Sequence, residues 1–106
     1  MDPIRDVSRE DLKAGLADGS VILVDVRETY EFESGAIPGS VSMPLSTFDP
    51  AALPQGRVVF SCAAGVRSRR AVDLAREAGL PHDEHYPGGF KGWVSSGEDV
   101  AYGTHG

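Results

Sequence analysis

The chain contains a single cysteine, Cys62, and its neighbours in the sequence are residues that can activate a thiol. An apolar run ends at Ser61, and small residues with one glycine, Gly65, follow before a helical pattern begins. A thiol reacts as a nucleophile in its thiolate form. A loop at the amino terminus of a helix directs N–H groups and the positive end of the helix dipole at such an anion. This pattern predicts nucleophilic chemistry at Cys62, whereas a lone cysteine without such a loop is most often an inert apolar residue.

Positive charge is concentrated directly after the cysteine, although the chain as a whole carries a formal net charge of −6. Arg67 lies within the expected loop and is the candidate ligand for a small anion. Arg69 and Arg70 fit a solvated helix start as well as they fit a binding role. The backbone of the loop is the remaining part of the predicted anion site, and its residues are Ala63, Ala64, Gly65, Val66 and Ser68.

The composition is that of one soluble globular domain, with 106 residues, 41% hydrophobic and 25% charged. An acidic chain of this kind is a poor partner for nucleic acid or anionic membranes. One cysteine cannot form an internal disulfide, and the first residues lack the basic and apolar regions of a signal peptide. No apolar run approaches the length of a membrane span. We therefore expect a cytoplasmic protein.

Strand and helix patterns alternate along the chain. The run Val21–Val26 is nearly continuous and β-branched, which is typical of a strand buried on both faces of a parallel sheet. The pattern predicts one α/β domain over residues 1–106, with a mostly parallel sheet of about five strands and helices on both faces. The core should span about residues 4–97, and the polar tail 98–106 should fray. Strands are expected at 21–26, 40–43, 57–61 and 82–86, and helices at 8–19, 27–35, 68–79 and after 89.

Four segments of the chain resemble one protein family. The run Cys62–Ser68 is similar to the C-x-x-G-x-R-S active-site loop of single-domain rhodaneses, the thiosulfate sulfurtransferase family. The resemblance extends from about Ile4 to Gly97 and departs at Ala36, where the family usually carries histidine. We expect this difference to change local packing more than chemistry. The other similar segments are Val24–Arg27 with Glu31-Phe32, Gly35–Val41 and Pro87–Trp93.

The resemblance implies a rhodanese-like fold and a catalytic Cys62. The cysteine would accept a sulfane sulfur from thiosulfate or a related anionic donor, and the resulting persulfide would pass that sulfur to a thiophilic acceptor. Residues 63–68 would hold the charged sulfur, and Arg67 would help to bind the donor. No metal or organic cofactor is required, and a monomer or weak homodimer is expected.

Two other functions use the same thiol. In the first, the protein is a persulfide carrier that delivers sulfur to a partner protein and turns over small donors weakly. In the second, Cys62 is a redox sensor, which is less favoured because no second cysteine is present to resolve a sulfenic acid.

Cysteine-dependent phosphatases of similar fold use a C-x5-R loop, whereas this chain has C-x4-R with Ser68 where their arginine would lie. The shorter loop favours sulfur over a phosphoryl group.

Two sets of titratable residues have predicted structural roles. Asp25, Arg27 and Glu31 are expected to form a buried ion pair that ties a strand end to the next turn, since buried charges are normally paired. The histidines lack convincing metal-ligand spacing and are expected at the surface; they are His82, His85 and His105.

Overall fold

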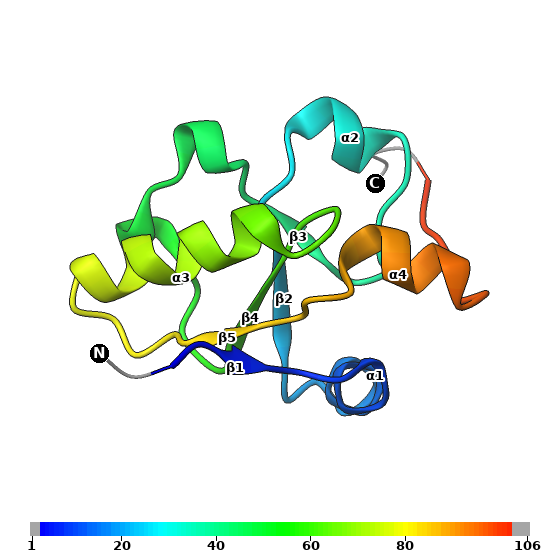
Figure 1. Ribbon diagram of the computed structural model, residues 1–106, viewed down its shortest axis with the longest axis horizontal. Helices are drawn as coiled ribbons and strands as arrows, with labels where there is room; N and C mark the ends of the chain where they lie inside the picture. The colour runs from blue at the N-terminus through cyan, green and yellow to red at the C-terminus, as the bar shows by residue number, and fades with distance from the viewer. Residues whose placement is uncertain (1–2, 103–106) are drawn as a thin grey trace.

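The computed structural model describes residues 3–102 and places a parallel β-sheet between layers of helices (Figure 1). Within these residues the sheet has five strands in the order β1-β5-β4-β2-β3, and every neighbouring pair is parallel. This confirms the predicted α/β fold. The strands are β1 Arg5–Asp6, β2 Ile22–Asp25, β3 Val41–Ser42, β4 Val58–Ser61 and β5 Glu84–His85.

The helices follow the strands much as the sequence predicts. Ser8 caps the first helix, with its side chain accepting a hydrogen bond from the backbone N–H of Asp11, and Gly19 ends that helix in the left-handed conformation. The segment around residues 46–54 forms two short 3₁₀ turns, η1 Leu45–Thr47 and η2 Pro50–Ala52. The α-helices in the described residues are α1 Arg9–Asp18, α2 Thr29–Glu33, α3 Val66–Glu77 and α4 Gly89–Ser95.

The two central strands divide the core into two parts because alternate side chains point to opposite faces. Leu23 and Val59 pack with α1 and α4 on one face. Val24 and Phe60 pack with α3 and the segment around the 3₁₀ turns on the other, and Figure 1 shows α1 and α3 on opposite sides of the sheet. All four side chains are fully buried. Cys62 continues the alternation of Val58 and Phe60 and belongs to the α3 face.

Helix α3 begins two residues earlier than the sequence pattern predicts. Gly65 adopts φ 86° and is its N-cap, so Val66 is the first helical residue. Arg67 and Ser68 therefore lie in the first turn of the helix, where the amides and the dipole are directed at the preceding loop. Strand β1 was not predicted from the sequence, because its two polar, exposed residues lack the apolar pattern of a buried strand.

The segment after α4 is more ordered than predicted. Ala101 exchanges two backbone hydrogen bonds with Ala36, and the Trp93 indole N–H donates to the carbonyl of Asp99. The expected fraying is therefore wrong for this stretch, because its backbone is paired with the domain. The rest of the predicted tail, residues 103–106, lies outside the described residues. In the part that is described, no helix is long and apolar enough to cross a membrane.

Candidate active site

Cys62 directly follows β4 and is almost fully buried, with 1% of its surface exposed. Its Sγ accepts hydrogen bonds from the backbone N–H of Gly65 at 3.1 Å and of Ser68 at 3.4 Å. The Ser68 hydroxyl oxygen lies 3.6 Å from the same sulfur. The Cys62–Ser68 loop thus converges on the sulfur atom, in the manner of an anion-binding nest at a helix amino terminus.

The surroundings of the thiol favour its ionised form. Burial on its own raises the pKa of the Cys62 thiol, since a charge is poorly solvated in the interior. Hydrogen bonds from the Ser68 hydroxyl and from the amides of Ser68, Ala64 and Gly65 act in the opposite direction, and the net effect lowers this pKa below its ordinary value. A thiolate in this position is a nucleophile at lower pH than a free cysteine.

The loop is held in place by the start of α4. The amide of Phe90 donates to the Cys62 carbonyl at 2.8 Å, and that of Lys91 donates to the Ala63 carbonyl at 3.0 Å. Gly89 makes this approach possible, because a Cβ at that position would lie 2.5 Å from the Ala63 oxygen. A Cβ on Gly65 would likewise lie 2.7 Å from the Pro87 oxygen. The segment with the paired glycines therefore supports the cysteine loop directly.

Arg67 faces a carboxylate at the edge of the loop. Its guanidinium donates to both carboxylate oxygens of Glu31, at 2.7 and 3.0 Å. The expected buried ion pair is confirmed for Asp25 and Arg27, which are 2.7 Å apart, and Arg27 also donates to the backbone carbonyl of Glu31 at 3.3 Å. The expectation is wrong for the carboxylate of Glu31, which pairs with Arg67 instead. No local pattern in the sequence indicates this contact, since the two partners are 36 positions apart.

The Arg67–Glu31 pair should make the stability of the protein sensitive to acid. The hydrogen bond from Arg67 is the main reason that the pKa of the Glu31 carboxyl falls from 4.5 to about 2. A carboxyl with a lowered pKa stabilises the folded state above its unfolded pKa, and this contribution is lost as the pH falls through the folded pKa. We expect Glu31→Gln to cost about 1–3 kcal/mol near neutral pH. The unfolding free energy of the Glu31→Gln variant should also decline less between pH 4.5 and about 2 than that of the wild type.

Urea denaturation at several pH values measures this difference. Glu33→Gln removes an exposed carboxylate from the same helix and is the matched control. Parallel pH profiles for Glu31→Gln and the wild type would show that the ion pair contributes nothing to folding.

The other predicted loop residues lie on the outside of the site. Ala63 is half-buried, whereas Ala64 and Val66 are exposed, with 77% of Val66 accessible to solvent. Arg69 and Arg70 are also exposed, and Arg70 contacts Glu77 at 3.5 Å. The exposed side chains of the loop are therefore small or apolar, and basic side chains follow them in the first turns of α3.

A buried histidine that the sequence pattern did not indicate lies behind the thiol. His85 was expected at the surface, but only 1% of it is exposed, because β5 lies inside the sheet between β1 and β4. Its Nδ1 lies 2.8 Å from the Ser68 hydroxyl, and its Nε2 lies 3.1 Å from a carboxylate oxygen of Asp6. The strand order brings these residues together. His82 is half-buried, and His105 lies outside the described residues.

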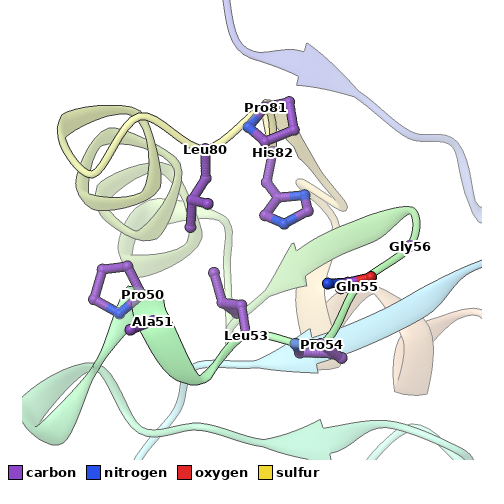
Figure 2. Close-up of a pocket in the computed structure, with 9 residues that line it drawn as sticks. All are labelled: Pro50, Ala51, Leu53, Pro54, Gln55, Gly56, Leu80, Pro81 and His82. Atoms are coloured by element: carbon purple, nitrogen blue, oxygen red, sulfur yellow. The ribbon is translucent and has the colours of Figure 1, made fainter.

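A cavity of about 360 Å³ lies beside the amino-terminal ends of β4 and β5 (Figure 2). Leu53 and Leu80 point toward each other across it, and the His82 ring extends into it. Its residues precede β4 and β5, whereas Cys62 follows β4, so this cavity is separate from the thiol. A second cavity of about 370 Å³ is bounded by α1, Pro38 and the end of α4.

Across residues 3–102, no three His, Cys, Asp or Glu side chains are grouped as metal ligands would be.

Sequence comparisons match this chain to one protein family and to named members of it. Residues 8–96 match the model of a family described as the rhodanese-like domain. Thiosulfate sulfurtransferase/rhodanese-like domain-containing protein 3 of Mus musculus is 38% identical over 106 residues, which cover 84% of this chain and 68% of the mouse protein. Thiosulfate:glutathione sulfurtransferase of Saccharomyces cerevisiae is 33% identical over 114 residues, which cover 91% of this chain and 82% of the yeast protein.

Solved structures agree with these sequence matches. The human single-domain sulfurtransferase superimposes with a TM-score of 0.74 at 32% identity, over 85% of this chain and 95% of that one. A protein of unknown function from Rhodopseudomonas palustris, described as a possible tyrosine phosphatase, superimposes with a TM-score of 0.78 at 30% identity. That match covers 92% of this chain and 85% of the other.

Proposed function

The chain belongs to the rhodanese-like domain family, and from this we propose that it is a sulfurtransferase in which Cys62 carries the transferred sulfur. The donor is thiosulfate or a related anion, and the acceptor is a thiophile such as glutathione or cyanide. One observation carries the proposal: two backbone amides converge on the buried Sγ of Cys62. Sulfur transfer needs such donors because Cys62 must be a thiolate both when it attacks the sulfur donor and when it leaves the persulfide.

The first step is attack of the Cys62 thiolate on the outer, sulfane sulfur of thiosulfate. A new S–S bond forms as the bond to the sulfonate sulfur breaks, and sulfite leaves with the electron pair. In the second step an acceptor thiolate attacks the outer sulfur of the persulfide, and Cys62 leaves as the thiolate. The amides of Gly65 and Ser68 are placed to stabilise the Cys62 thiolate before the first step, when it attacks, and after the second step, when it leaves.

Arg67 has a more limited role in this proposal than its sequence position implied. Two nitrogens of its guanidinium donate to the two carboxylate oxygens of Glu31, so the net charge of the pair is close to zero. The exposed guanidinium group of Arg69 supplies long-range attraction for an anionic donor, whereas the charge of Arg70 is offset in part by Glu77. Arg67 then acts mainly by fixing the first turn of α3 against α2.

A phosphatase reaction fits this loop less well, even though one structural relative is described as a possible tyrosine phosphatase. The C-x4-R spacing places Ser68, a buried residue, where the arginine of a C-x5-R loop would lie. A tetrahedral phosphoryl group also needs a wider ring of donors than a single sulfur atom. We therefore propose sulfur, and not phosphate, as the transferred group.

A persulfide carrier is the second candidate function, and the exposed Val66 favours it. An apolar side chain with 77% exposure beside the reactive loop is suited to contact with an acceptor protein. A carrier would accept sulfur on Cys62 but release it slowly to glutathione or cyanide. Pull-down from lysate with sulfur-loaded and unloaded protein would identify an acceptor that binds the loaded form alone.

Intact-protein mass spectrometry tests the step that both functions share. Incubation with thiosulfate should add about 32 Da, the mass of one sulfur atom, and peptide mapping should place it on Cys62. Treatment with a thiol reductant should remove the added mass, since a persulfide is reducible. A thiol that alkylates readily with iodoacetamide yet stays unmodified by every sulfur donor would contradict the proposal.

A further inference from the structure

A line of hydrogen-bonding side chains connects the Cys62 thiol with the edge of the sheet. It runs from Sγ to the Ser68 hydroxyl at 3.6 Å, then to His85 Nδ1 at 2.8 Å. His85 Nε2 in turn lies 3.1 Å from a carboxylate oxygen of Asp6. We propose that this chain is a proton relay, in which His85 receives the proton of Cys62 through Ser68.

The relay is shielded from solvent over most of its length. Ser68 is fully buried, and Cys62 and His85 are each 1% exposed, so water does not replace their mutual hydrogen bonds. The Asp6 side chain is 68% exposed and connects the chain with solvent. Four separate elements supply these residues, namely β1, β5, α3 and the end of β4. Such an arrangement is fixed by the fold and not by a local turn.

Donor and acceptor rules determine where the protons lie before reaction. An ionised carboxylate only accepts hydrogen bonds, so His85 must carry a proton on Nε2 in order to donate to Asp6. The Nδ1 of neutral His85 is then an acceptor, and the Ser68 hydroxyl donates to it. Ser68 has one proton, so its oxygen presents a lone pair to the S–H group of Cys62. In this state the relay accepts the thiol proton at Ser68.

Ionisation of the thiol reverses each of these bonds. The S–H proton passes to the Ser68 oxygen as the original hydroxyl proton passes to Nδ1 of His85. An S–H bond and an O–H bond break, and an O–H bond and an N–H bond form. The products are a thiolate that accepts from Ser68 and an imidazolium that donates to both Ser68 and Asp6. The total charge is unchanged, and no other reactant is needed.

The surroundings of His85 favour a neutral imidazole, which can accept a proton, as long as Cys62 is a thiol. Burial is the largest influence and lowers the pKa of the His85 imidazole, and Arg69 on α3 lowers it further. Asp6 on β1 raises this pKa through its hydrogen bond and its charge, without reversing the net lowering. The imidazole is thus unprotonated near neutral pH, and protonation is favoured only when a thiolate forms beside it.

This inference rests on the proposed function, because the relay serves the thiol that would carry sulfur. His85 acts through Ser68 and does not touch a substrate, so it is a positioning residue for the reaction. Its test must therefore read the ionisation of Cys62 directly. Alkylation of unloaded protein by iodoacetamide does this without any sulfur donor, so the relay and the sulfur-transfer proposal can fail independently.

His85→Asn is the informative variant. An asparagine Oδ1 occupies nearly the position of Nδ1 and can accept from Ser68, but it cannot bind a proton at neutral pH. We expect the midpoint of the alkylation profile to rise by about one pH unit, with about tenfold slower alkylation near neutral pH. His82→Asn is the matched control, since His82 belongs to the separate cavity, and it should leave the profile unchanged.

A second variant distinguishes a relay from a local packing effect. Ser68→Ala removes the connecting oxygen, so His85→Asn should have no further effect on the alkylation midpoint in that background. The relay would be overturned by an unchanged midpoint in His85→Asn, or by shifts that simply add in the double variant.

Nuclear magnetic resonance of the wild type gives a reading that does not depend on how well the variants fold. The ¹⁵N shifts of His85 should show an Nε2–H tautomer near neutral pH. As the pH falls from the alkaline side, Nδ1 should take up its proton at a higher pH in the wild type than in Cys62→Ala, because only the wild type places a thiolate beside the imidazole. An Nδ1–H tautomer at rest would equally overturn the proposal.

Discussion

Cys62→Ser is expected to lose transfer of sulfur from thiosulfate to cyanide by a factor on the order of 10³ or more. A serine hydroxyl fits the space of the thiol but stays protonated at any pH that the protein withstands, so the loop has no anion to stabilise. The amides of Gly65 and Ser68 remain in place, and they cannot compensate for a nucleophile that does not form.

Thiocyanate formation measures this loss, with the melting temperature of each protein recorded in parallel. Because Cys62 is buried in a polar loop and serine keeps hydrogen bonds to the same amides, the variant should unfold at a similar temperature. Residual turnover near the wild-type level would place the chemistry at another group and overturn the assignment of Cys62.

Gly89→Ala is expected to destabilise the protein by roughly 3 kcal/mol or more and to slow alkylation of Cys62. The backbone at Gly89 has φ 64°, which a side chain already disfavours. The added Cβ would in addition lie 2.5 Å from the Ala63 oxygen and 2.6 Å from the Cys62 oxygen. Relief of that overlap must move either α4 or the cysteine loop, and movement of the loop misaligns the amides that face the sulfur.

Gly79→Ala separates the cost of a side chain on a left-handed backbone from the cost of overlap with the cysteine loop. Gly79 has φ 78°, a similar left-handed backbone, but a Cβ there would meet nothing within 4 Å. This control should cost about 1–2 kcal/mol, the conformational penalty alone, with normal alkylation of Cys62. Urea denaturation of both variants gives the difference. Equal losses of stability would show that the contact between Gly89 and the loop is not a constraint.

Sequence alone determined the local parts of this protein. Adjacent residues form the strand, the glycine turn and the first helical turn around Cys62, so their types and spacing were sufficient to predict a thiol that faces backbone amides. The same holds for the α/β alternation and the parallel sheet, because apolar periodicity records which face of each element is buried. The start of α3 was misplaced by two residues, since the capping role of Gly65 is set by its φ angle.

Only the tertiary structure decided which charged and polar groups meet the loop. Arg67 pairs with Glu31 of α2, a partner 36 positions away that no local pattern indicates. His85 was predicted at the surface, yet it is buried beside Ser68 and Asp6. Hydrophobic periodicity shows that a strand is buried but not which strands flank it. The order β1-β5-β4 brings together residues from opposite ends of the chain, and that order is set by the packing of the whole sheet.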